Sequence, residues 1–270
     1  MKSLITLMTA GGLLAAFAMG QPRYAITDLG TLPGGNFSQA TALNDNRLAA
    51  GIVSDASGTQ YAALWAGPFR FNLGTPGLNA EAFGVNNSGQ VSIQTETSAK
   101  DPNNENFCAY GTGLKCVAAI WQRGALTVLP TLGGNNSTVG VINNKGEIVG
   151  LAENATRDAA CSHAVSLSGT GPQLLDFQAV IWGPKPGDIR ELHPLPGDTV
   201  GLAVGINDSG QAVGASGTCA NTELPPLAFG PHAVLWERTA RLTTSAISAR
   251  HTKISLCSST TQGRWLGLRQ

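Results

Sequence analysis

Residues 139–151 read Val-Gly-Val-Ile-Asn-Asn-Lys-Gly-Glu-Ile-Val-Gly-Leu, and this stretch decides the fold. Two short runs of strand-forming residues flank the tetrapeptide that begins at Asn143 and ends at Gly146. Glycine supplies the positive φ that closes such a tight turn between two antiparallel strands. The stretch therefore predicts a β-hairpin.

The same hairpin occurs four times along the chain. Its turn residues are Asn44 in the first copy, Asn86 and Gly89 in the second, Asn143 and Gly146 in the third, and Asn207 and Gly210 in the fourth. In the first copy we expect Asn46 to stand in for glycine, because asparagine is the next-best residue for a left-handed conformation.

Each hairpin is followed by a strand of the form Ala-x-x-Trp. These strands end at Trp65, Trp121, Trp182 and Trp236, and a fourth short strand follows each of them. The repeat units span approximately residues 37–74, 79–130, 137–193 and 200–245. Units of four strands that repeat at 40 to 60 residues are typical of propeller blades.

The fold expected from these repeats is all-β, a β-propeller of about four four-stranded blades within residues 21–245. A β-sandwich or β-prism of the same hairpins is the alternative. Small residues precede each turn asparagine at two and four positions, as the crowded axis of a propeller requires. The four tryptophans are large enough to fill the wider outer gap between blades, so we assign them to the repeat core.

Closure of the ring is left open by the sequence. Residues 24–30 resemble a fourth strand that arrives before any other strand, and the last unit has only a poor fourth strand of its own. The orphan strand could complete the last blade and close a ring of four, which would remove an exposed edge. The competing hypothesis is an open fragment of an incomplete larger propeller.

The first 20 residues are expected to be a signal peptide. Lys2 precedes an almost unbroken apolar run that ends in small residues, as signal peptidase requires. We therefore predict a secreted protein, extracellular or periplasmic, with no membrane attachment after cleavage. Residues 246–270 diverge from the repeats, and we expect them to form a poorly ordered tail.

Charge limits the classes of partner. Seventeen basic and seventeen acidic residues cancel, and only 13% of the chain is charged. Without an excess of positive charge, binding to nucleic acid is disfavoured.

All five cysteines lie beyond the predicted signal peptide, where an oxidising compartment favours pairing. Cys108 and Cys116 share one insertion and are expected to form a local disulfide. Cys161 and Cys219 occupy corresponding insertions of adjacent units and are expected to pair across them. Cys257 is then the free thiol.

The repeats resemble a known family. The motif Asp-Leu-Gly-Thr-Leu-Pro-Gly-Gly at residues 28–35, with the Ala-x-Leu-Trp strands at 61–65 and 232–236, is similar to the HAF repeats of bacterial extracellular repeat proteins. The resemblance covers roughly residues 24–240. It implies secretion or surface display and a β-propeller, and it supplies no catalytic residues. The hallmark histidine is replaced in three units, by Tyr61, Val117 and Gln178.

Long insertions between the second and third strands of a unit all fall on one face of the predicted ring. Their acidic residues are Asp101, Glu105, Glu153, Asp158, Asp176 and Glu223. Paired carboxylates could support glycosidic bond cleavage, but no motif of a nucleophile, metal, phosphate or dinucleotide site accompanies them. We therefore name no catalytic, cofactor-binding or metal-binding residue, and expect no cofactor.

The function expected from these features is that of a secreted, non-enzymatic β-propeller. It would bind an extracellular ligand, either a glycan or a protein, on the insertion face, or serve as a surface scaffold. The alternative is a secreted polysaccharide hydrolase or lyase on the same scaffold.

Overall fold

The computed structural model describes residues 24–75, 77–159, 161, 172–219, 232–238 and 242–243. The predicted signal peptide, Cys257, Glu223 and the tail from 246 to 270 lie outside these residues. The described chain is all-β and forms four antiparallel sheets of four strands each, arranged as the blades of a β-propeller. The expected fold class is confirmed.

Each sheet is built from four strands that follow one another in the chain. The first contains β1 (Ser38–Leu43), β2 (Leu48–Ser54), β3 (Gln60–Ala66) and β4 (Phe69–Asn72). The second contains β5 (Ala80–Val85), β6 (Val91–Lys100), β7 (Leu114–Gln122) and β8 (Ala125–Val128). The third contains β9 (Gly133–Ile142), β10 (Ile148–Arg157), β11 (Leu175–Trp182) and β12 (Ile189–Leu192). The fourth contains β13 (Val200–Ile206), β14 (Ala212–Gly217), β15 (His232–Trp236) and β16 (Leu242–Thr243).

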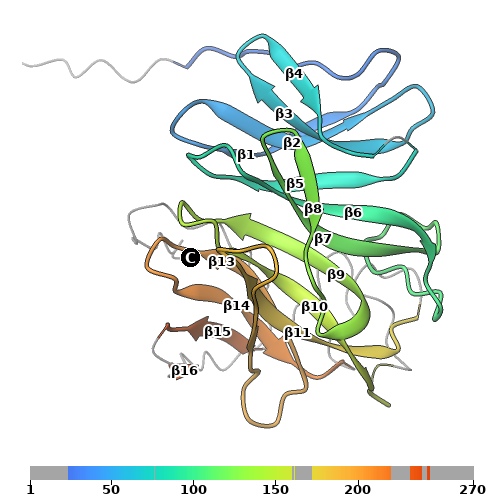
Figure 1. Cartoon of the computed structure of the whole chain (residues 1–270), viewed down its shortest axis with the longest axis vertical. Coiled ribbons are helices and arrows are strands. Elements are labelled where there is room, and N and C mark those ends of the chain that lie inside the picture. The colour runs from blue at the N-terminus through green and yellow to red at the C-terminus, as the bar shows by residue number, and fades with distance from the viewer. Residues whose placement is uncertain are drawn as a thin grey trace, which may run out of the picture.

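In Figure 1 the first sheet lies at the top, the second lies below it, and the third and fourth sheets share the lower half. Separate apolar clusters fill the spaces between the first and second sheets, the second and third, and the third and fourth. Small side chains permit this close approach, and a Cβ added to Gly84 would lie 2.8 Å from the backbone nitrogen of Ile142 in the next sheet. The core is therefore a series of interfaces between blades.

The hairpin turns have the expected conformation. Gly89, Gly146 and Gly210 all have positive φ, with values of 74°, 78° and 79°. The expectation that Asn46 takes the place of glycine in the first copy is wrong, because the residue with positive φ is Arg47, at 62°. When the turn asparagine is counted as the first residue, the fourth residue has the left-handed conformation in every copy.

The turn asparagines also join neighbouring blades. The side-chain amide of Asn44 donates to the backbone carbonyl of Asn86 at 2.8 Å, Asn86 donates to Asn143 at 3.0 Å, and Asn143 donates to Asn207 at 3.0 Å. Each side-chain oxygen meanwhile accepts backbone N–H groups of its own turn, as in Asn86 with Ser88 and Gln90. One side chain thus closes a turn and bridges two sheets, a series that we call the asparagine ladder.

A second row of bonds runs beside the asparagine ladder at the next position of the turn. The backbone N–H groups of Asp45, Asn87 and Asn144 donate to the side-chain oxygens of Asn87, Asn144 and Asp208, respectively. The turn therefore fixes the position of each blade relative to the next blade.

The last three repeated tryptophans, Trp121, Trp182 and Trp236, pack in the gap between blades and face the preceding sheet, whereas Trp65 packs against Leu29 and Leu32 on the first blade. Two of them also donate a hydrogen bond across that gap. The indole N–H of Trp182 reaches the carbonyl of Pro130 at 2.8 Å, and that of Trp236 reaches the carbonyl of His193 at 2.9 Å.

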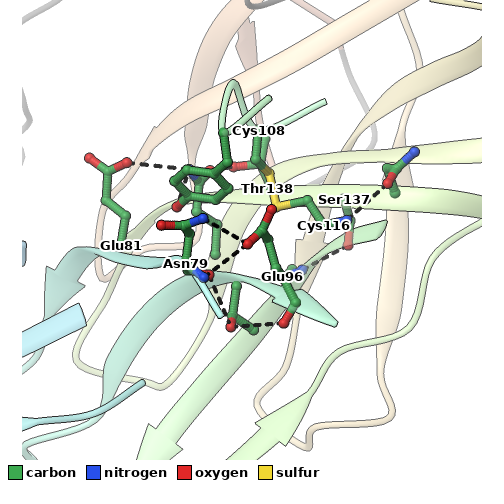
Figure 2. The surroundings of a disulfide bond; sticks show 12 residues. Asn79, Glu81, Glu96, Cys108, Cys116, Ser137 and Thr138 are labelled. Atoms are coloured by element: carbon green, nitrogen blue, oxygen red, sulfur yellow. Dashed lines mark hydrogen bonds between the residues drawn. A yellow bond between two sulfur atoms is a disulfide. The ribbon is translucent and has the colours of Figure 1, made fainter. Parts of the chain in front are cut away.

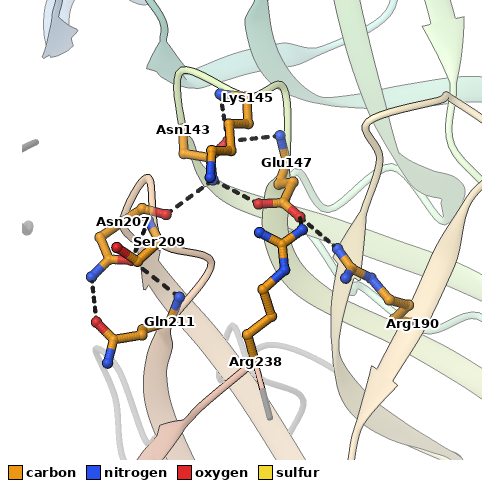
Figure 3. Close-up of polar contacts among 8 residues, drawn as sticks. All are labelled: Asn143, Lys145, Glu147, Arg190, Asn207, Ser209, Gln211 and Arg238. Carbon is orange, nitrogen blue, oxygen red and sulfur yellow. Dashed lines mark hydrogen bonds and ion pairs between the residues drawn. The ribbon is translucent and has the colours of Figure 1, made fainter.

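Glu147 adds an ionic connection between the third and fourth sheets (Figure 3). Its buried carboxylate accepts from Asn143 at 2.9 Å and pairs with Arg190 at 2.8 Å and Arg238 at 3.2 Å. Burial works to raise the pKa of Glu147, but the hydrogen bonds from Arg190 and Asn143 and the charge of Arg238 hold it below its usual range.

The expectation that residues 24–30 complete the fourth blade is wrong. This segment forms no strand, and the side chains of Tyr24 and Ile26 are 91% and 100% exposed. It lies against the first sheet, where Leu29 packs on the cluster around Trp65. β15 pairs with β16 at the site where the segment was expected. The first and fourth sheets stand at opposite ends of the stack, so the four blades form an open arc (Figure 1).

The asparagine ladder predicts a difference between two otherwise matched substitutions. Asn86→Ala removes a turn cap and an inter-blade bond, whereas Asn207→Ala removes the same turn bonds and, in the described chain, no inter-blade bond. We expect Asn86→Ala to lower the free energy of unfolding by about 0.5–1.5 kcal/mol more than Asn207→Ala, which is the net contribution of one hydrogen bond, since the Asn143 carbonyl keeps the N–H of Gly146. Urea unfolding of dilute protein measures the difference, and equal losses would show that the ladder contributes no stability.

Candidate functional site

The insertion face carries the longest connections, as expected. The second-to-third-strand connections are residues 101–113, 158–174 and 218–231, and the first two sets of flanking strands extend further than predicted. Lys100 still pairs with Leu114 in the second sheet, and Arg157 pairs with Leu175 in the third. The insertions are therefore partly continuations of the blades.

Both expected disulfides are present. Cys108 and Cys116 are bonded with their Cα atoms 6.0 Å apart, and Cys161 and Cys219 with theirs 4.8 Å apart. The first bond joins the insertion of the second blade to β7 of the same blade (Figure 2), and the second bond joins the third and fourth blades. Two disulfides are consistent with an extracellular or periplasmic location.

The four cysteines belong to a second core beneath the insertions. It contains Phe107, Phe177 and Leu202 beside the disulfides, and the rings of Phe107 and Phe177 meet edge to face with centroids 6.3 Å apart. This core, which we call the insertion core, draws on the second, third and fourth blades. The disulfides therefore serve to tie long loops to the ring.

Three of the acidic residues predicted for this face meet at the edge of the insertion core. Glu105 and Glu153 are fully buried, and Asp101 is nearly so. The side-chain amide of Gln173 lies between the two glutamates, 3.0 Å from Glu153 and 3.4 Å from Glu105. Asn136 bridges Glu153 and Asp101 in the same way, at 3.1 Å and 2.9 Å.

These three carboxylates mainly satisfy the backbone of the insertions. Glu105 accepts the N–H groups of Leu174 and Leu175, and Glu153 accepts those of Asn135 and Asn136. Burial, followed by the nearby charge of Glu105, raises the pKa of Glu153 to about 8. Fully buried carboxylates without contact to solvent act as structural braces, since a substrate cannot reach them.

Asp158 and Asp176, the other described acidic residues of the insertions, form hydrogen bonds elsewhere. Asp158 accepts from Thr199 at 3.0 Å, and Asp176 accepts from Asn154 and Gln178. Burial raises the pKa of Asp176. Among the residues with described positions, no group of three or more histidine, cysteine or acidic side chains is arranged to hold a metal ion. No helix of the described chain is long and apolar enough to cross a membrane.

A polar cluster beside the inner strands β5 and β9 was not predicted from the sequence. It consists of Glu81, Gln94, Tyr110 and Thr138, and we call it the Gln94 cluster. The buried amide of Gln94 donates to the Glu81 carboxylate at 3.3 Å and to the Tyr110 hydroxyl at 3.1 Å, and its oxygen accepts from Thr138. Glu81 appears beside the disulfide in Figure 2.

Three members of the Gln94 cluster reach solvent. Glu81, Tyr110 and Thr138 are partly exposed, whereas Gln94 is buried beneath them. Burial raises the pKa of Glu81 to about 7, and burial also raises the pKa of Tyr110, so the phenol keeps its proton. The cluster therefore presents an acid that titrates near neutrality and two hydroxyl groups on a fixed amide.

One signal for the Gln94 cluster was present in the sequence. Glu81 is the single charged residue on the inner strands β1, β5, β9 and β13. Equivalent positions carry Gln39, Thr138 and Leu202, as the strand registers show. A charge that breaks the pattern of a repeat suggests function, but the contribution of Tyr110 from the insertion required the structure.

Comparison with protein-family models and with curated proteins gives no match for this chain.

The raised pKa of Glu153 predicts how stability depends on pH. Its usual value is 4.5, and its folded value is about 8, so the folded state holds the proton more tightly. The stabilisation of the folded state that results from this proton is complete below about pH 4.5 and is lost as pH rises to about 8. We expect the melting temperature of Glu153→Gln to improve relative to the unsubstituted protein over that range. A difference that stays constant with pH would contradict the burial effect, and Asp188→Asn, at an exposed carboxylate, is the control.

The two disulfides should differ in their contribution to stability. Cys161 and Cys219 are 58 residues apart in the chain, against 8 for Cys108 and Cys116. A longer closed loop restricts the unfolded chain more strongly, by about 1–2 kcal/mol for this pair of lengths. We expect replacement of Cys161 and Cys219 by serine to destabilise the protein more than the same change at Cys108 and Cys116. Denaturant unfolding tests the order, which the reverse ranking would overturn.

Proposed function

We propose that this protein is a secreted, non-enzymatic β-propeller that binds a hydroxyl-rich extracellular ligand, a glycan, at the Gln94 cluster. The observation that carries the proposal is the convergence of Glu81, Tyr110 and Thr138 on one buried amide. Carboxylate, phenol and hydroxyl groups held in fixed positions are suited to hydrogen-bond the hydroxyl groups of a sugar.

The rigid surroundings of the cluster support binding. Tyr110 belongs to the insertion that the Cys108–Cys116 disulfide closes, and Thr138 belongs to the neighbouring blade. A site whose side chains are held by packing and covalent bonds loses little conformational entropy when a ligand binds. The site also lies on the face where the longest connections gather.

The cellular location forms part of the same proposal. An apolar leader at residues 1–20, two disulfides in the folded part and the resemblance of the repeats to HAF repeats all favour export. An external glycan or surface polymer would then be accessible to the insertion face.

A hydrolase or lyase is the second candidate, because an acid that titrates near pH 7 has the protonation behaviour of a general acid. Hydrolysis of a glycosidic bond needs a second accessible carboxylate. The other carboxylate near Tyr110 is that of Glu96. It is buried and accepts hydrogen bonds from Asn79 and Thr112, which favours binding without turnover.

Retention on immobilised glycan polymers, with reducing-end release measured in parallel, tests the proposal. We expect retention without release, and about tenfold weaker retention for Glu81→Gln because a charged acceptor is lost. Binding should strengthen as pH rises through about 7, where the Glu81 carboxylate ionises and becomes a better acceptor.

Glu191→Gln, on an outer strand, is the matched control and should bind like the unsubstituted protein. Release of reducing ends would overturn the non-enzymatic assignment. Retention that is unaffected by Glu81→Gln would move the site away from the Gln94 cluster.

A further inference from the structure

The first blade has the surface of a blade that follows another blade, yet no blade within the described residues covers it. The apolar residue before the turn asparagine is Leu43, Val85, Ile142 and Ile206 in the four copies. Its exposure is 7%, 8% and 4% in the second, third and fourth blades, where the preceding blade covers it, and 72% in the first. Ala40 is likewise exposed, whereas its equivalents Ala82, Val139 and Ala203 are buried.

Trp65 of the first blade likewise lacks a contact that its equivalents make with the preceding blade, in this case a hydrogen bond. The side chain is only 2% exposed, and its buried indole N–H has no hydrogen-bond partner among the described residues. The equivalent groups of Trp182 and Trp236 donate to a carbonyl at the end of the preceding blade. Beside Trp65 lies a hollow of about 580 Å³ whose lining includes Leu29, Ala40, Ala42 and Leu43.

The fourth blade has the opposite surface, that of a blade which precedes another. Ala233 and Leu235 on β15 are partly exposed, whereas their equivalents in the first three blades are buried against the next sheet. Those equivalents are Ala62, Ala118 and Ala179 for the first position, and Leu64, Ile120 and Ile181 for the second. The side-chain amide of Asn207 donates to Gln211 at 2.8 Å, and its second N–H has no acceptor in the described chain.

These two surfaces complement each other. The asparagine ladder ends at Asn207 with an unused donor, and it begins at Asn44 with a carbonyl that no preceding blade contacts. In each of the three interfaces within the chain, this donor and this carbonyl meet across neighbouring blades. The arc therefore ends in the two halves of its own repeated interface.

We propose that a second copy of this chain occupies both ends, so that two four-bladed arcs pack head to tail and close a ring of eight blades. The fourth blade of each copy lies on the first blade of the other. Two copies satisfy both ends with two-fold symmetry, and eight blades lie within the range that propellers adopt, whereas three copies would give twelve.

The second copy also gives residues 25–28 a strand to pair with. They precede Leu29 as β4 precedes Leu73 and β8 precedes Leu129, which places them as the fourth strand of a blade before the first. The partner's β15 would supply the missing third strand, with residues 25–28 taking the place of its own fourth strand, β16, which has only two residues and pairs with β15 at two positions. Pairing there brings the Gly30 carbonyl to the place of the acceptor that Trp65 lacks.

The native mass of the full chain tests the proposal first. We expect twice the mass of one chain by light scattering, and a single-chain mass for Leu43→Glu, which places a charge in the junction. Leu43 is exposed within one chain, so circular dichroism should show an unchanged fold. Val128→Glu is the control, since Val128 is also exposed, at 54%, but on an outer strand. A single-chain mass for the unsubstituted protein overturns the proposal.

A cross-link identifies which ends meet. Asp45 and Asp208 follow the turn asparagines of the first and fourth blades. At the same turn position, Asn87 and Asn144 contact their neighbours in the adjacent blades. Replacement of both by cysteine, in a Cys257→Ser background, should give a covalent dimer that is absent from either single substitution. The change also removes a like-charge contact from the junction.

The remaining outcomes each overturn the proposal. A disulfide within one chain would mean that the arc closes on itself. A series of products larger than a dimer would indicate an open filament. A third result would be that no cross-link forms and that removal of residues 244–270 changes the native mass. This result would assign the exposed surfaces to that segment of the same chain.

Discussion

The hydrogen bond from a turn asparagine to the next blade is the interaction on which the rest of the structure depends. The backbone of each hairpin needs Asn86 or its equivalents to close the turn, and the same amide holds the neighbouring sheet. A blade consequently cannot take its position without a neighbour, and stability is distributed over interfaces between repeats. The small residues of the inner strands and the large tryptophans of the third strands complete each interface.

The insertions solve a different problem. They extend beyond the repeated blades, so the repeat provides no neighbour for them, and they build their own core from two disulfides, two phenylalanines and buried carboxylates. Glu105 and Glu153 accept backbone N–H groups that would otherwise be buried without partners. The rigid surface that results holds Tyr110 beside Glu81 and gives the Gln94 cluster its shape.

Local features of the fold could be predicted from the sequence because each repeats in chain order. The turns, the tryptophan strands, the four sheets and both disulfide pairs were predicted from spacing alone. Features that depend on the neighbouring blade could not be predicted in this way. The partner of Asn86 lies 57 residues away, and the spacing of a motif does not state which carbonyl its side chain reaches.

Two questions that the sequence left open have the same physical answer. Residues 24–30 were one of two hypotheses for closing the fourth blade, because the sequence shows a strand without a partner but not how far the arc curves. The acidic residues of the insertions were considered for chemistry without being assigned to it, and Glu105 and Glu153 are buried, whereas Glu81 on an inner strand is partly exposed. Exposure depends on packing between segments that are distant in the chain.

Amide hydrogen exchange in the Leu43→Glu chain, which we expect to be a single arc, tests most directly whether each turn depends on the next blade. The backbone N–H groups of Asp45, Asn87 and Asn144, in the row beside the asparagine ladder, donate to the next blade, and in the described chain that of Asp208 has no following blade to reach. We predict slow exchange at the first three positions and fast exchange at Asp208. Equal rates at all four positions would contradict this prediction, because the turns would then be protected without their neighbours.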